Sequence, residues 1–173
     1  MSGRRTVLIG VGNPFRGDDG IGPALAAAVR ARGLPGVHVV DTDGEPASLL
    51  AAWTGAGLVV LVDAVRCLPA HPGRIHRTSV GSLPHGAAPA SSHGIGVPEA
   101  IELGRVLGRV PERLVVYAVE AAHLGFGTTL SPEVAAALPE LLRQVLDELD
   151  QAGDPAVRRR APCPPGKPWT SEV

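Results

Sequence analysis

The segment VLIGVGNPFRGDDGIG, residues 7–22, decides how this chain begins to fold. Its apolar run has the composition of a short buried strand and stops at Gly10, and an amphipathic helical pattern begins at Ile21. The loop between them carries two adjacent carboxylates, Asp18 and Asp19. Loops at the carboxyl ends of strands are where α/β proteins place ligand-binding groups. Because two carboxylates repel phosphate, this loop favours a cation.

Strand and helix patterns alternate along the rest of the chain. Further strands are predicted at 37–40, 58–62, 74–80 and 114–119, and helices at 21–32, 46–53, 97–107 and 132–151. This order predicts an α/β fold, a three-layer α/β/α domain around a central, largely parallel twisted sheet of about five strands. The polar–apolar alternation of 74–80 is typical of an edge strand. We expect one domain over residues 1–152 and a flexible Pro/Arg-rich tail over 153–173.

Composition excludes several classes of function. The 173 residues are 45% hydrophobic and carry a net charge of −1 without a basic stripe, which argues against nucleic-acid and anionic-membrane binding. The apolar run after Arg4-Arg5 is too short for a signal sequence or a membrane span, so a cytoplasmic protein is expected. Cys67 and Cys163 form no Cys-x-x-Cys pair, which argues against a disulfide framework and a multi-thiolate zinc site. We expect a monomer, since no long exposed apolar stripe stands out.

Acidic residues gather at the predicted strand ends. They are Asp18 and Asp19 after the first strand, Asp41 and Asp43 after the second, and Asp63 after the third. In a parallel sheet these ends meet at one edge, where clustered carboxylates favour a cation. His93, between Ser91-Ser92 and Gly94, is the best candidate for a nitrogen ligand. A structural interpretation stays open, in which Asp18 or Asp19 caps the helix, Asp63 bonds loop amides and His93 has no role.

Other chemistry has weaker support. The glycines of the first loop depart from Gly-x-Gly-x-x-Gly and lack a Gly-Lys-Ser/Thr ending, although Asp41 or Asp43 could serve as the ribose-binding acid of a dinucleotide site. Cys67 could act with a histidine, but a packing role is expected. Glu45, Glu120 and His123 are further candidates at the rim, and each is expected to be a solvated loop residue.

Four motifs, in order and spacing, carry a family resemblance. They are Gly10–Asn13 with Gly17–Gly22, then Leu61–Ala64, Ser92–Gly94 and Gly125–Pro132. Across about residues 5–150 the chain resembles the nickel-iron hydrogenase maturation endopeptidases. The resemblance implies an α/β enzyme that removes a C-terminal extension from the precursor of a hydrogenase large subunit after nickel insertion.

The same resemblance implies a site. The family's metal ligands fall by position on Asp19, Asp63 and His93, which would act in catalysis through the metal. Some members carry Glu where this chain has Asp19. Asp41 matches a further family acid only weakly, because the usual Asp-Gly-Gly is Asp41-Thr42-Asp43 here. The implied cofactor is nickel, which the precursor itself could supply, and other divalent metals could substitute.

The sequence leaves two other functions open. A non-catalytic nickel-binding maturation chaperone or sensor would use the same ligands but remove no peptide from the nickel-loaded precursor. A nucleotide-dependent enzyme would use the glycine loop at 10–17 and would not need His93.

Overall fold

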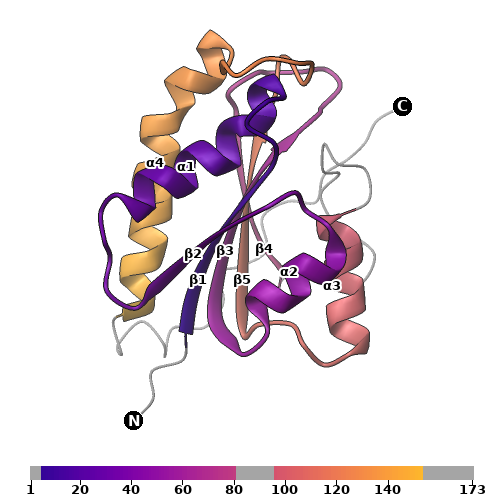
Figure 1. The fold of residues 1–173 in the computed structure, drawn as a ribbon, viewed down its shortest axis with the longest axis vertical. Coiled ribbons are helices and arrows are strands. Elements are labelled where there is room, and N and C mark those ends of the chain that lie inside the picture. The colour runs from indigo at the N-terminus through magenta and orange to yellow at the C-terminus, as the bar shows by residue number, and fades with distance from the viewer. Residues whose placement is uncertain (1–4, 81–95, 154–173) are drawn as a thin grey trace.

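The computed structural model describes residues 5–80 and 96–153, in which helices and strands alternate (Figure 1). The elements are β1 (Arg5–Val11), the 3-10 helix η1 (Gly17–Gly20), α1 (Ile21–Arg30), β2 (Val37–Thr42), α2 (Pro46–Trp53), β3 (Ala56–Val65), β4 (Ile75–Ser79), α3 (Val97–Val106), β5 (Arg113–Glu120) and α4 (Pro132–Gly153). The predicted division at 152/153 falls at the end of α4. Residues 154–173, most of the predicted tail, lie outside the described residues, so the domain boundaries stay a prediction.

The five strands form one sheet in the order β2-β1-β3-β5-β4. The β1–β2, β1–β3 and β3–β5 pairs are parallel, and β4 pairs with β5 in the antiparallel direction. The largely parallel sheet and the edge position of the 74–80 strand are therefore confirmed.

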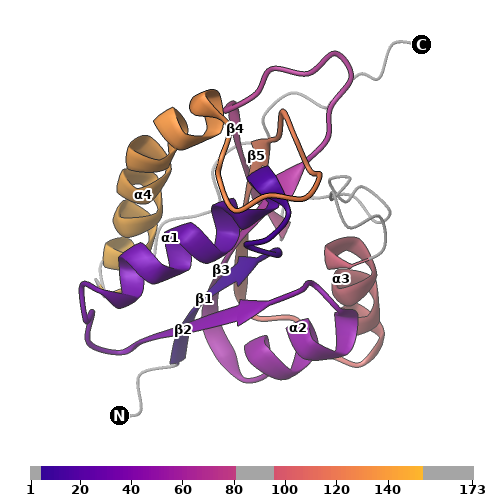
Figure 2. The same ribbon diagram turned by 45° about the horizontal axis from the view of Figure 1, so that its top comes forward.

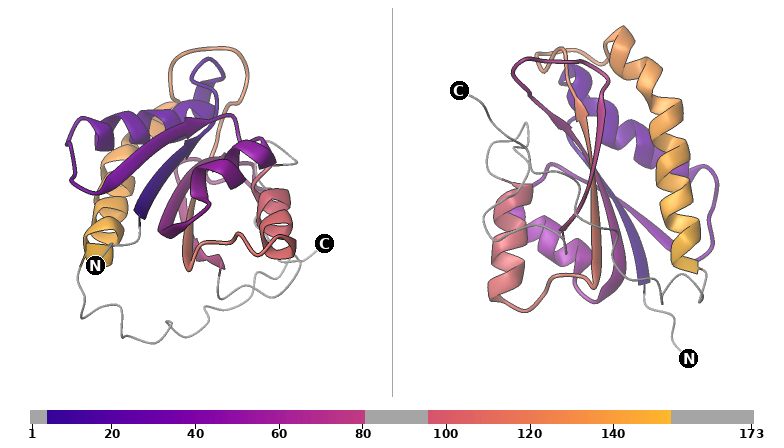
Figure 3. Two further views of the ribbon diagram at one scale, coloured as in Figure 1. Left: turned by 60° about the horizontal axis from the view of Figure 1, so that its bottom comes forward. Right: turned by 180° about the vertical axis from the view of Figure 1, so that it is seen from behind.

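Helices cover both faces of the sheet. Figures 1 and 3 show α1 and α4 on one face and α2 and α3 on the other. Successive side chains of β3 point to opposite faces of the sheet and so contribute to both hydrophobic cores. Val60 and Val62 pack on the α1/α4 side, while Val59 and Leu61 pack on the α2/α3 side. The three-layer prediction is confirmed. Among the described helices, none is long and apolar enough to cross a bilayer.

Helix α1 approaches the sheet closely at its first turn. A Cβ on Gly22 would lie 2.2 Å from the carbonyl oxygen of Val11 and 2.8 Å from that of Val62. On the strand side, a Cβ on Gly10 would lie 2.5 Å from the carbonyl oxygen of Gly22. These glycines are therefore explained by close helix–strand packing, which removes a reason to assign them to a phosphate.

Strands β2 and β3 extend past the predicted ends. The pattern predicted that they stop at Val40 and Val62, but pairing continues to Thr42 in β2 and to Val65 in β3. Asp63 therefore lies inside β3, in register with Ala118 of β5. The polar side chain does not end the strand, because backbone pairing with the neighbouring strand continues past it.

Candidate active site

Asp18 is a structural anchor. Its side chain is fully buried, and Oδ2 accepts hydrogen bonds from the amides of Ala122 and His123, both at 2.8 Å, and from Ser131 Oγ at 2.9 Å. The amide of Ser131 donates to Oδ1 at 2.6 Å. Burial raises the pKa of Asp18, but these four hydrogen bonds outweigh it and hold the pKa below its ordinary value. The carboxylate therefore joins the loop after β5 to η1. Figure 2 shows this loop beside the start of α1.

The prediction that Asp18 or Asp19 caps α1 is wrong. Gly20 occupies the position before α1, and no side chain hydrogen-bonds to the helix from there. Both aspartates lie instead in η1, a 3-10 turn that the sequence pattern did not indicate. This extra turn directs each carboxylate to a partner other than the amides of α1.

Asp19 is held against the end of β1. Its side chain is 2% exposed, and the amide of Asn13 donates to Oδ2 at 2.8 Å. A Cβ on Gly12 would lie 1.9 Å from the carbonyl oxygen of Asp19, and Gly12 has φ of +137°. Glycine is needed there for both reasons, so the first loop fixes the backbone that carries Asp19.

Asp63 comes from the middle of the sheet. It is 2% exposed, and the amide of Ala64 donates to its Oδ1 at 2.8 Å. Since Val62 and Ala64 face α1 and α4, alternation places the Asp63 side chain on the α2/α3 face. The neighbouring strand β1 leads into the loop of Asp19, and η1 contacts β3. Asp19 and Asp63 therefore lie at the same edge of the sheet.

Asp41 is placed elsewhere. It is exposed in β2, and Arg30 Nη2 lies 2.6 Å from its Oδ2. Val39, two residues earlier, packs against the α1/α4 core, so Asp41 belongs to the face opposite that of Asp63. The structure does not bring this acid to the other two.

The other predicted acids of this edge have local partners. Asp43 accepts a hydrogen bond from the amide of Glu45 at 3.1 Å, and Glu45 caps α2 by accepting from the amide of Ser48 at 3.2 Å. The expectation that Glu45 is a solvated residue is confirmed by its exposure, with a capping role added.

His93 lies outside the described residues. The described chain resumes at Gly96, where a Cβ would lie 2.5 Å from the carbonyl oxygen of Gly44 in the β2–α2 connection. Asp19 and Asp63 by themselves offer buried carboxylate oxygens, which are common ligand atoms for divalent cations. Their chemistry fits a divalent cation, and an added imidazole would suit nickel.

Sequence reasoning missed a second cluster of chemically active side chains. Glu120 was expected in a solvated loop, but it belongs to β5 and is 2% exposed. Its Oε1 lies 2.7 Å from His76 Nε2, and its Oε2 accepts from the amide of His71 at 2.6 Å. Burial raises the pKa of Glu120, but these contacts with the two histidines outweigh it and lower the pKa.

Cys67 completes this cluster. Burial raises the pKa of the thiol, and the nearby charge of Glu120 raises it further. The sequence gave one indication of this cluster, namely an acid, Glu120, directly after the apolar run 114–119. It offered none for the pairing of β4 with β5 that brings His76 alongside.

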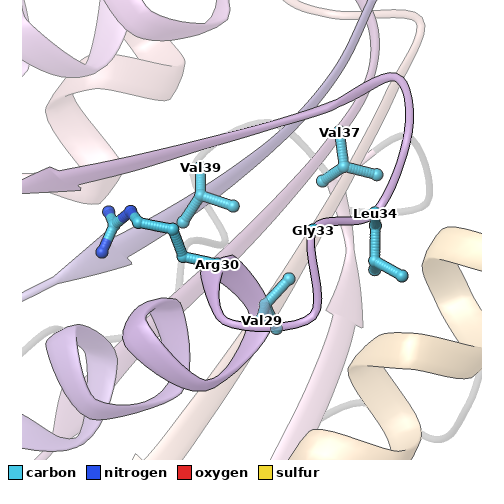
Figure 4. A pocket seen from close by; sticks show the side chains of 6 residues that line it. All are labelled: Val29, Arg30, Gly33, Leu34, Val37 and Val39. Carbon is cyan, nitrogen blue, oxygen red and sulfur yellow. The ribbon is translucent and has the colours of Figure 1, made fainter.

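A shallow pocket lies away from these residues, between the end of α1 and β2 (Figure 4). Its lining is apolar apart from one guanidinium and one glycine, and comprises Val29, Arg30, Gly33, Leu34, Val37 and Val39. Helix α1 starts at the edge of Asp19 and ends at this pocket, and Asp19, Asp63 and Asp41 are not among the described residues that line it.

Known proteins resemble this chain in sequence and in fold. The family model described as hydrogenase maturation protease matches residues 23–148. The chain belongs to the hydrogenase maturation protease family. It is therefore a peptidase. This favours the endopeptidase hypothesis over the nickel-binding chaperone and the nucleotide-dependent enzyme.

Two curated relatives agree with the family assignment, and one solved structure shares the fold. The hydrogenase expression/formation protein HupD of Thiocapsa roseopersicina is 29% identical over 159 residues, covering 88% of this chain and 71% of the relative. The hydrogenase 2 maturation protease of Escherichia coli is 27% identical over 160 residues, covering 91% and 98%. The E. coli hydrogenase maturating endopeptidase HYBD superposes with a TM-score of 0.75 at 24% identity, covering 86% of this chain and 94% of that one. This last likeness confirms the predicted α/β architecture.

Proposed function

We propose that this peptidase removes the C-terminal extension of a nickel-iron hydrogenase large-subunit precursor after nickel has been inserted. Family membership supports a hydrogenase precursor as the substrate. The observation that carries the proposal is the placement of Asp19 and Asp63, two carboxylates that are each 2% exposed, at one edge of the sheet. We propose His93, three residues before Gly96 in the sequence, as the third member of the site.

In this mechanism Asp19, Asp63 and His93 would hold the nickel that the precursor carries, or another divalent metal in its place. A bound divalent cation would polarise the scissile carbonyl or lower the pKa of a water molecule. Asp19 and Asp63 are suited to orient the substrate because each sits on a fixed backbone, one beside the end of β1 and one within β3. Their low exposure keeps bulk water from screening the charges that recognise the substrate.

The proposed ligands would also account for dependence on nickel. A precursor without nickel would lack the bridge between its own ligands and these three side chains, so cleavage would wait for insertion. We propose that the enzyme acts in the cytoplasm as a monomer that meets the loaded precursor.

The test follows the loss of mass from a purified precursor, loaded with nickel or left without it. Wild-type protein is expected to shorten the loaded precursor only. The Asp19→Ala, His93→Ala double variant is expected to leave the precursor intact, and Asp147→Asn, on the exposed side of α4, serves as the matched control. Equal cleavage of the loaded precursor by the double variant would refute the mechanism.

A further inference from the structure

Three side chains with different donor atoms meet beside β4. Cys67 follows β3, His76 lies in β4 and Glu120 ends β5. One potential ligand atom from each, a sulfur, an imidazole nitrogen and a carboxylate oxygen, lies within 4.8 Å of the other two. The three come from positions 67, 76 and 120 in the sequence, so only the fold assembles them.

The sheet register explains why they meet. Val65 is paired with Glu120, so β3 brings the chain to within two residues of Cys67 at this point. His76 is paired with Ala118, two residues from Glu120 on the same face of β5. The meeting point thus follows from paired strands, with Cys67 added by the connection that leaves β3.

We propose that Cys67, His76 and Glu120 bind a divalent transition-metal ion such as zinc, at a site separate from Asp19, Asp63 and His93. Thiolate, imidazole and carboxylate are the usual ligands of zinc, and three protein ligands leave one tetrahedral position for water or another group. His71 also lies near Glu120, with Nδ1 3.9 Å from Oε2.

The geometry needs little adjustment. Zinc–ligand bonds of about 2.0–2.3 Å place tetrahedral ligand atoms roughly 3.3–3.6 Å apart. The 2.7 Å contact between His76 Nε2 and Glu120 Oε1 would widen by at least about 0.6 Å, because the metal replaces the shared proton. That proton is released to solvent, and the neutral imidazole carries its remaining proton on Nδ1. Cys67, which is partly exposed on the connection after β3, would move inward. As the bond to the metal forms, the Sγ–H bond breaks and its proton passes to solvent.

This cluster is a neighbour of the active site and does not share its ligands. Ala118 of β5 is paired with Asp63 on one side and with His76 on the other. Strands are about 4.8 Å apart, so the backbones of Asp63 and His76 are separated by roughly 10 Å across β5. Metal bound here would cross-link β5, β4 and the connection that joins β3 to β4, beside the edge where the substrate is cut.

Cobalt(II) tests the site through its sulfur ligand. Titrating the reduced full-length protein with Co²⁺ alone is expected to produce the ultraviolet thiolate-to-cobalt absorption. The band should disappear in Cys67→Ser and weaken in His76→Ala, with at least a tenfold loss of affinity for the latter. Cys163→Ser is the matched cysteine control, and Asp19→Asn with His93→Ala disables the proposed active site; both should keep the band.

The wild-type and Cys67→Ser titrations each test the proposed metal site. Absence of the band in wild-type protein, or its survival in Cys67→Ser, would overturn the proposal. Since serine is nearly isosteric with cysteine and position 67 is partly exposed, this variant should fold, which circular dichroism would verify. The outcome is independent of precursor cleavage, so it leaves the proposed function untouched.

Discussion

Replacing Asp18 with asparagine tests whether the loop after β5 is held by a charged side chain. Asparagine has the shape of aspartate but one acceptor oxygen in place of two. In wild type the amide of Ser131 donates to Oδ1 at 2.6 Å. If the asparagine oxygen takes the place of Oδ2, its side-chain NH₂ faces that amide, and two donors then oppose each other. One charge-assisted hydrogen bond is lost, at about 1.5–3 kcal/mol, and the other three become neutral. We expect Asp18→Asn to lower the free energy of unfolding by about 2–4 kcal/mol at pH 7.

Acid provides a second signature of the same interaction. Because the folded-state pKa of Asp18 is depressed, its contribution to stability is present above the unfolded value of about 3.9 and is lost as pH falls through the folded value. Asparagine does not titrate, so the difference in stability between wild type and variant should shrink below about pH 4.

Urea unfolding from pH 7 to pH 3 measures both effects. Asp147→Asn is the matched control, since its carboxylate is 55% exposed and paired on the surface with Arg143, and it should cost less than about 1 kcal/mol. Native-state hydrogen exchange should show faster exchange at the amides of Ala122, His123 and Ser131 in the Asp18 variant. A cost at position 18 no larger than that of the control, or one that stays constant into acid, would refute the reasoning.

Two further predictions concern packing and burial. Tyr117 is the chain's single tyrosine, and burial, together with the charge of Glu148, raises its pKa to about 12. Phenolate absorbance should therefore titrate near pH 12 in wild type and at lower pH in Glu148→Gln. The contribution of Tyr117 to stability should be lost as pH rises from about 10 towards 12. A midpoint unchanged in the variant would exclude Glu148 as a cause. Gly22→Ala should destabilise by more than about 2 kcal/mol despite alanine's better helix propensity, because its Cβ would lie 2.2 Å from the carbonyl oxygen of Val11. Gly104→Ala is the control, since the atom nearest to its added Cβ is a side-chain methyl of Val110 at 3.2 Å, and thermal unfolding should show it within about 1 kcal/mol of wild type. Equal destabilisation at positions 22 and 104 would contradict the close approach of α1 to the sheet.

Local periodicity predicted most of the secondary structure. Helix α2 was predicted at 46–53 and runs from Pro46 to Trp53, because proline favours a first turn and the apolar residues that follow give the helix a buried side. The alternating 74–80 segment predicted an edge strand, and β4 occupies the edge. These features depend on residues close in sequence, and so a sequence can reveal them.

Strand ends and the roles of individual acids were harder to predict. Asp41 and Asp63 look alike in the sequence, as acids that follow apolar runs. In the fold Asp63 faces α2 and α3, while Asp41 pairs with Arg30 beside α1. Which face a residue takes depends on strand register, and a shift of one residue reverses it.

The sequence by itself determined the α/β class, the order of the elements and the loop in which Asp19 lies, because the apolar periods and glycine positions are local properties. The tertiary structure alone decided that Asp18 serves as an anchor, since its partners lie more than 100 positions away at 122, 123 and 131. It also assembled Cys67, His76 and Glu120, which meet only through strand pairing. Hydrogen bonds and ligand sites need atoms within a few ångströms of one another. For residues so distant in the chain, the distance between their side chains is set by the assembly of the tertiary structure.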